Sequence, residues 1–152
     1  MGFLKRLFFG KPPRRIEHPV LGEALLIETK SGSYWEIETK VAGRTFTVTV
    51  ETVGEQEPTE AQARFFEQFS RDPDSAFRKA SVLLVPEYEK WVRETFPSRW
   101  QEAFQFVGMS VPVAADERNP WDLSFECLKD RAGHLFTCTF ENAVPTWVQI
   151  DG

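Results

Sequence analysis

The chain has little of what builds disulfide-stapled, metal-binding or membrane-spanning proteins. Its 152 residues include two cysteines and two histidines, Cys127, Cys138, His18 and His134, and these do not form the close pairs that ligate zinc. No apolar run approaches the roughly 20 residues needed to cross a bilayer. The first residues also lack the apolar stretch and the small-residue cleavage site of a secretory signal. We therefore expect a cytoplasmic protein without a disulfide framework, a metal or another cofactor.

Sequence patterns of catalysis are also missing. There is no Gly-x-Ser-x-Gly elbow, no Gly-rich phosphate loop and no His-Glu-x-x-His helix. Paired carboxylates can catalyse glycoside hydrolysis, and Glu36 and Glu38 lie two residues apart on one strand, roughly 7 Å between Cα atoms. That spacing is common in strands and does not by itself indicate such an enzyme. Cys127 and Cys138 fall on the inward side of a predicted hairpin, as small buried hydrophobes do. We identify no catalytic residue, and an enzyme of unrecognised type remains an alternative because active sites can assemble from scattered residues.

Charge is distributed very unevenly along the chain. Residues 1–15 carry five basic residues and no acid, which leaves 13 basic and 23 acidic residues in the remainder, a net charge of −10. Such an asymmetry is typical of a tail with its own partner or surface. We therefore divide the chain into a basic leader, residues 1–15, and a single domain, residues 16–152.

The leader has the pattern of a short amphipathic helix that ends before Pro12-Pro13. Its apolar stripe is Phe3, Leu4, Leu7 and Phe8, and Lys5 and Arg6 lie on the other side. Such a helix could rest weakly on the anionic inner surface of the membrane. The alternative is a terminus that frays or packs on the body, because two turns of helix are marginal in water.

The segments Tyr34–Val41 and Arg44–Glu51 alternate in polarity around the turn Ala42-Gly43. With that turn, one face pairs Trp35, Ile37 and Thr39 with Val50, Val48 and Phe46. The other face pairs Tyr34, Glu36, Glu38 and Lys40 with Glu51, Thr49, Thr47 and Thr45. One buried face and one wet face are typical of an antiparallel sheet covered on one side. We expect Glu23–Thr29 to add a third strand, with Leu25 and Ile27 on the buried face.

The middle of the chain reads as helices and the last third returns to strands. Thr59 and Gln62 form a capping box, and a second helical stretch begins near Asp74 and contains Pro86, which should kink or split it. Alternation then resumes, and Pro112 suggests an edge strand. The predicted fold is α+β, in two layers, with antiparallel sheet or sheets in βββ–helices–βββ order and the helices packed on one face.

The outward faces of the two hairpin blocks form an acidic platform. Its candidate partner-binding residues are Glu36, Glu38, Glu51, Thr47, Thr49, Asp122 and Glu126. Carboxylates in such an array steer a basic partner and define its register, although a solvated sheet face has the same composition. The acidic loops Gly54–Pro58 and Ala114–Pro120 are further contact candidates. Nucleic acid is a poor partner for this body because phosphate binding requires cations.

Several short motifs resemble those of small bacterial proteins of unknown function, some of them similar to immunity proteins. These motifs are Met1-Gly2-Phe3-Leu4, Phe8-Phe9-Gly10-Lys11, His18-Pro19, His134-Leu135-Phe136 and Ile150-Asp151-Gly152. The resemblance implies a domain that neutralises a toxin by binding it. We therefore expect a non-catalytic cytoplasmic interaction domain that binds a basic protein through its acidic face. A peripheral membrane protein held by the leader is the alternative.

Overall fold

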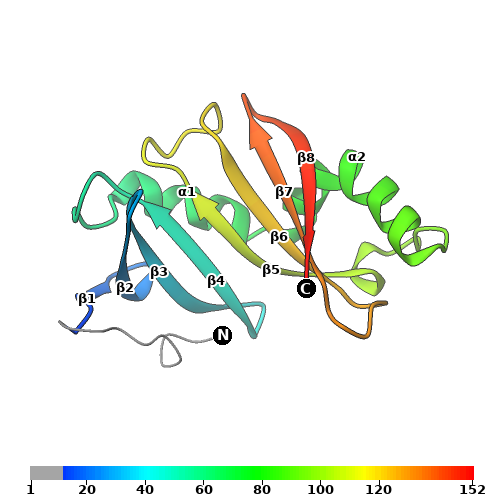
Figure 1. Cartoon of the computed structure of the whole chain (residues 1–152), viewed down its shortest axis with the longest axis horizontal. Helices are drawn as coiled ribbons and strands as arrows, with labels where there is room; N and C mark the ends of the chain where they lie inside the picture. Colours follow the sequence, from blue (N-terminus) through cyan, green and yellow to red (C-terminus); the bar gives the residue numbers. More distant parts are fainter. Residues whose placement is uncertain (1–11) are drawn as a thin grey trace.

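A computed structural model describes residues 12–152, and its main feature is one eight-stranded sheet. Figure 1 shows the strands side by side, with both helices behind them. The strands are β1 (Arg15–His18), β2 (Gly22–Thr29), β3 (Gly32–Val41), β4 (Arg44–Glu51), β5 (Phe104–Val111), β6 (Trp121–Cys127), β7 (Leu135–Glu141) and β8 (Val144–Asp151). Between β4 and β5 come α1 (Glu60–Ser70), α2 (Pro73–Val92) and the 3-10 turn η2 (Trp100–Glu102).

The predicted βββ–helices–βββ α+β arrangement is wrong. Strands account for 43% of the chain and helices for 24%, and all described strands belong to one sheet in sequential order from β1 to β8. Each half is a four-stranded antiparallel meander, and the halves meet where β4 runs parallel to β5. We call this junction, residues 47–50 against 108–111, the β4–β5 seam. Pairing across the long helical connection leaves no periodic signal in the sequence, so the joining of the blocks could not be predicted.

The strand β1 and the position of β5 were also missed. β1 has only four residues, Arg-Ile-Glu-His, which are too few and too charged to reveal a period of two. β5 is a central strand that ends at Val111, one residue before Pro112, so the proline marks a strand end and the prediction of an edge strand is wrong.

The predicted register of β3 and β4 is confirmed. Glu36 pairs with Thr49 and Glu38 with Thr47, as the Ala42-Gly43 turn dictates.

The assignment of faces on β2 is wrong, however. Leu25 pairs with Glu36 and Ile27 with Tyr34, so these aliphatic residues lie on the side away from the helices. Ala24 and Leu26 occupy the helix side instead. Because both faces of β2 are buried, its apolar run does not reveal which residues point which way.

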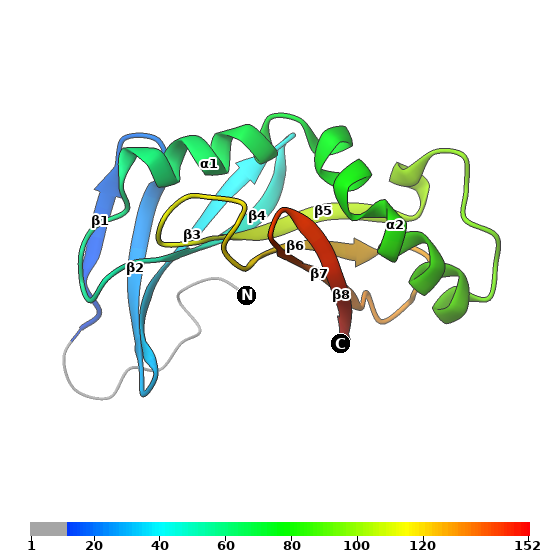
Figure 2. The same ribbon diagram turned by 90° about the horizontal axis from the view of Figure 1, so that it is seen from above.

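Both helices lie on the same side of the sheet (Figure 2). The capping box of α1 is confirmed: the Gln62 backbone N–H donates to Thr59 Oγ1 and the Thr59 N–H donates to Gln62 Oε1. α2 is capped by Asp72, whose carboxylate accepts from the Ser75 N–H at 3.1 Å. The helix continues through Pro86 to Val92 without being split.

Aromatic rings fill the space between the helices and the sheet. The α1 rings of Phe65 and Phe69 pack on Trp121 of β6, with ring centroids 5.0 and 4.5 Å apart. Phe77 of α2 lies edge-on to Phe125 at 6.0 Å. Such pairs gain roughly 0.5–1.5 kcal/mol each beyond the burial of their area. This packing occupies one face of the sheet and leaves the other face to be considered as a site.

The two cysteines are free and buried, as expected of small core residues. Cys138 pairs with Leu123, whereas the Cys127 N–H donates to the His134 carbonyl, so the cysteines are not opposite or diagonal neighbours. Burial raises the pKa of the Cys138 thiol to about 12, which keeps it protonated and unreactive.

Candidate functional site: the open face of the sheet

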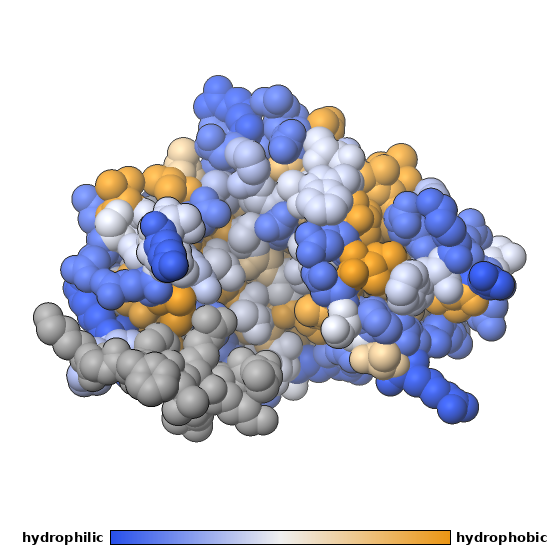
Figure 3. Space-filling view, in the orientation of Figure 1, coloured by the Kyte–Doolittle hydropathy of each residue, from blue (hydrophilic) through white to orange (hydrophobic). Residues whose placement is uncertain are grey.

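The face of the sheet opposite the helices, here called the open face, carries a groove across the β4–β5 seam. Its cavity volume is about 830 Å³. Figure 3 looks onto this face, where pale, weakly polar surface occupies the middle of the sheet. The groove is lined chiefly by hydroxyl and carboxyl residues: Glu36, Thr45, Thr47, Thr49, Ser110, Asp122, Ser124, Glu126 and Thr137.

The seam brings the two predicted acidic blocks together on one face. Thr47 and Thr49 of β4 pair with Gly108 and Ser110 of β5, and Ser110 is followed in the next strand by Asp122. Alternation in each strand then places Glu36 and Asp122 on the same side of the sheet, although they are far apart in sequence. Of the seven predicted partner-binding residues, five line the groove: Glu36, Thr47, Thr49, Asp122 and Glu126.

The floor of the groove requires glycine at position 108. A Cβ built on Gly108 would lie 2.9 Å from the Thr47 carbonyl oxygen. A β-bulge between Phe106 and Gly108 shifts the register of β5 against β6 at the same place. Bulges re-aim side chains and increase the local twist. The floor of the groove therefore lies where β5 has no side chain and is irregular.

Asp122 is held by hydroxyl groups from both neighbouring strands. Thr139 Oγ1 donates to its Oδ1 at 2.7 Å, and the Asp122 backbone N–H donates to Ser110 Oγ at 2.8 Å. Ser124 and Thr137 form a second hydroxyl pair at 3.1 Å. These bonds fix the Asp122 carboxylate on the sheet without neutralising its charge.

The pKa of Glu51 is affected by the nearby carboxylate of Asp122. Partial burial, and then the negative charge of Asp122, raise the pKa of the Glu51 carboxyl above its ordinary value. A negative charge that disfavours the ionisation of a neighbouring carboxyl adds to the negative potential of this region. Glu51 itself lies outside the groove lining, beside a second hollow bordered by Glu28, Tyr34 and Val113.

The remaining predicted carboxylates differ in exposure. Glu38 is exposed, whereas Glu36 has only 6% of its surface accessible, so the expectation that Glu36 faces water is wrong. Its register partner Leu25 is fully buried on this side of β2, which makes its surroundings partly apolar. Glu126 lies against the β6–β7 turn, with Oε1 2.9 Å from the position a Cβ on Gly133 would take.

Two cations stand at the end of the groove near the β3–β4 turn. Lys40 Nζ donates to Thr45 Oγ1 at 3.1 Å, and Arg44 Nη1 donates to Gln105 Oε1 at 2.6 Å. Both bonds are made to neutral oxygens, so the groove has an acidic middle and a basic end. A complementary ligand would place positive charge over the acidic middle of the groove and no positive charge at the end that holds Lys40 and Arg44.

Three of the acids in the two candidate loops, Glu57, Asp116 and Glu117, are paired with cations of the chain. Arg14 lies 3.7 Å from the Glu57 carboxylate, and Lys79 lies 3.1 Å from that of Glu117. Asp116 accepts from the Arg118 side chain. These intrachain ion pairs offset part of the negative charge of the loops.

The predicted membrane-contact residues, Phe3, Leu4, Lys5, Arg6, Leu7 and Phe8, lie outside the described residues. The two described cations of the leader contact the body. Arg14 lies over the Trp35 ring at 5.5 Å, and Arg15 pairs with Glu23 across the β1–β2 ladder. Among residues 12–152, no helix combines the length and the apolar character needed to cross a membrane.

One polar cluster was not predicted from the sequence. The Asp130 carboxylate accepts from Trp91 Nε1 and the Ala132 N–H, each at 2.9 Å, and is bonded to His134 Nδ1. Trp91 also lies edge-on to the His134 ring. The spacing of Asp130 and His134 around the turn was visible in the sequence, but the third partner comes from a distant helix. The cluster anchors the β6–β7 turn to α2.

The side chains of the open face can form hydrogen bonds through their hydroxyl groups and attract cations through their carboxylates. The lining of the groove contains neither histidine nor cysteine. Within residues 12–152, no three His, Cys, Asp or Glu side chains are grouped so as to hold a metal ion. No family model, curated protein or solved structure matches this chain.

Proposed function

We propose that this chain is a non-catalytic interaction domain whose open face binds a positively charged partner protein. The observation that carries the proposal is the assembly of Glu36, Asp122 and Glu126, from both halves of the chain, around one groove. Glu38 and Glu51 add exposed carboxylates on the same face.

The shape and chemistry of this face suit a protein surface. The groove spans several strands, and the threonine and serine hydroxyls that line it offer donors and acceptors at the spacing of the sheet. Carboxylates beside it would accelerate the approach of a cationic partner and select its orientation. An immunity-like role, in which the domain covers a basic toxin and blocks it, is the concrete form of this proposal.

Charge reversal tests the proposal. Glu38→Lys with Glu126→Lys changes two carboxylates of the open face, while Glu60→Lys with Glu102→Lys makes the same change on the helix side. A partner recovered with the wild-type protein is then measured by calorimetry at low and high salt. We expect the first double variant to weaken binding by at least about tenfold, and the second to leave it within about twofold.

Salt dependence provides an independent measurement. Affinity should fall as ionic strength rises, because salt screens the attraction between the carboxylates of the open face and a cationic partner. Equal binding by wild type and the open-face variant, with no salt dependence, would contradict the proposal. Both variants should first be shown to unfold at the temperature of the wild type, so that loss of binding is not loss of fold.

A further inference from the structure

The last strand, β8, forms one edge of the sheet in the described part of the chain (Figure 1). Its outer backbone N–H and C=O groups are therefore not paired with another described strand. Proteins protect such edges with short strands, charges, prolines or bulges. The opposite edge is protected in this way, since β1 has four residues and bears Arg15 and Glu17.

Within the sequence of β8 the protective features are confined to its beginning, and α2 contacts the strand from the helix side. Pro145 lies there, and a register shift occurs opposite it between Thr139 and Phe140. The loop before β6 also covers this end, because the Ala143 N–H donates to the Glu117 carbonyl at 2.9 Å. Residues 146–151 contain neither a proline nor a lysine or arginine that would guard the edge.

The side chains of the open stretch form two different rows. Trp147, Gln149 and Asp151 lie on the open face, opposite Thr139, Thr137 and Leu135, and 52% of the Trp147 surface is exposed. Val148 and Ile150 lie on the helix side, partly buried against the core. A strand added here would therefore meet an aliphatic row on one face and an indole and a carboxylate on the other.

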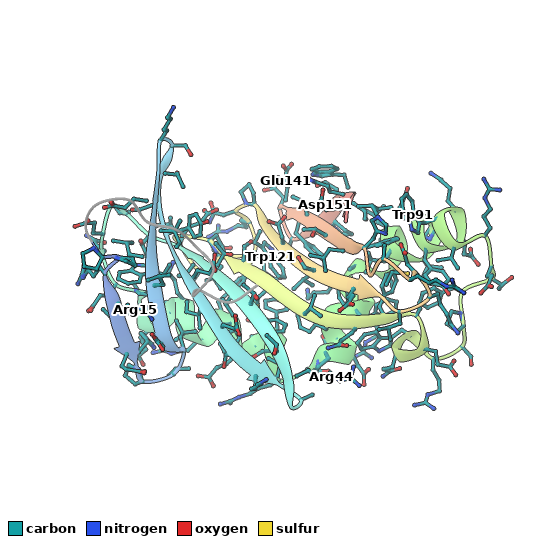
Figure 4. All side chains as sticks on the ribbon, turned by 60° about the horizontal axis from the view of Figure 1, so that its bottom comes forward. Arg15, Arg44, Trp91, Trp121, Glu141 and Asp151 are labelled. Carbon is teal, nitrogen blue, oxygen red and sulfur yellow. The ribbon has the colours of Figure 1, made fainter. Side chains whose placement is uncertain are left out.

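The charge of this half of the sheet is of one sign. The strands β6, β7 and β8 contain four acids and no base, and all four acids lie on the open face: Asp122, Glu126, Glu141 and Asp151. Figure 4 shows Glu141 and Asp151 on the β8 side of the sheet. Cationic side chains on an added strand would be complementary to this field.

We propose that β8 accepts an extended segment of a partner protein as a ninth strand, with lysine or arginine alternating with aliphatic residues. The cations would lie beside Asp151 and over the Trp147 ring, and the aliphatic side chains beside Val148 and Ile150. Backbone hydrogen bonds supply affinity in this mode, and the alternate side chains supply specificity. A cation over an indole adds attraction. The inference rests on the proposed function, since the segment belongs to the same cationic partner.

The test uses a capped peptide of alternating lysine and valine, about as long as β8. A control peptide has the same composition with all lysines first. Binding is followed by hydrogen exchange of the β8 amides in the full chain. The alternating peptide should slow exchange in residues 146–151 and bind at least about tenfold more tightly than the control. Gln149→Lys, which places a cation on the edge, should weaken binding by a similar factor, whereas Gln101→Lys on η2 should not.

Three results would overturn the inference. They are equal binding of the two peptides, exchange in β8 that the peptide leaves unchanged, and concentration-dependent protection of β8 without peptide, which would show a second copy on this edge. The proposed function fails separately. If Glu38→Lys with Glu126→Lys abolishes partner binding but Gln149→Lys has no effect on it, the open face binds the partner and β8 does not.

Discussion

Thr47 of β4 and Gly108 of β5 are register partners in the parallel pair at the centre of the sheet, and their backbones approach so closely that residue 108 has no room for a side chain. The Thr47 carbonyl oxygen lies 2.9 Å from the place of a Cβ on residue 108. This contact fixes both the junction of the two meanders and the floor of the groove on the open face.

Gly108→Ala should destabilise the fold by about 1–3 kcal/mol, because the added methyl meets backbone that cannot move independently. The strain should also separate β4 from β5 locally and lower affinity for an open-face partner. Chemical denaturation measures the first effect. Ser124→Ala, which removes an atom from the neighbouring position of β6, is the control and should cost less than about 1.5 kcal/mol. Equal stability of Gly108→Ala and wild type would show that the seam is looser than described.

Gln62 joins the start of α1 to both halves of the sheet. It is 1% exposed, and its Nε2 donates to the Glu51 carbonyl at 2.6 Å and to the Pro112 carbonyl at 3.1 Å. Gln62→Met keeps the volume but removes these donors, and we expect a loss of about 2–4 kcal/mol in unfolding free energy. Thr59→Ala removes only the cap and should cost about 1 kcal/mol. Similar losses in the two variants would assign the role of Gln62 to capping alone.

Glu51→Gln should stabilise the protein at neutral pH. The folded-state pKa of Glu51 is raised, so ionisation opposes folding above the ordinary carboxyl pKa, and this cost is absent when the carboxyl is protonated in both states. The gain should stay below about 1 kcal/mol because solvent screens this half-exposed group. It should vanish as the pH falls below the ordinary carboxyl pKa. Unfolding curves across this range test the sign, and a destabilised variant at neutral pH would contradict it.

Asp130→Asn should weaken the attachment of the β6–β7 turn to α2. The hydrogen bond from Trp91, together with those from Ala132 and His134, lowers the pKa of the Asp130 carboxyl in the folded state. The stability it contributes is present above the ordinary carboxyl pKa and is lost as the pH falls through the lowered folded-state pKa. The variant should therefore melt at a lower temperature than wild type at neutral pH, and the difference should disappear in acid. Trp91→Phe, which removes the indole donor, is the companion variant.

The sequence was informative where local rules decide the structure. The Ala42-Gly43 turn fixes the pairing of Glu36 with Thr49, and Thr59 with Gln62 fixes the start of α1. The sequence was misleading where both faces of a strand are buried, because apolar residues then no longer alternate with polar ones. On β2 every residue from 24 to 27 is buried, so alternation could not show that Leu25 shares a face with Glu36.

The candidate site required contacts between distant segments. Each acidic strand face could be found from alternation, but the union of Glu36 with Asp122 depends on the β4–β5 seam, which joins residues about 60 positions apart by a parallel pairing. The bulge before Gly108 and the exposed edge at Trp147 have no local signature either. The sequence thus predicted which acidic and hydroxyl residues share a strand face, but it could not predict that the β4–β5 pairing joins the two strand blocks into one open face.

Because the described halves of the sheet share a strand ladder only along the β4–β5 seam, a molecule that rests on both halves acts as a clamp on the native state. Saturation with such a ligand should raise the melting temperature of both meanders as one transition. The lining of the groove comes from both meanders, so binding of such a ligand across the seam would be linked to the stability of the joined sheet.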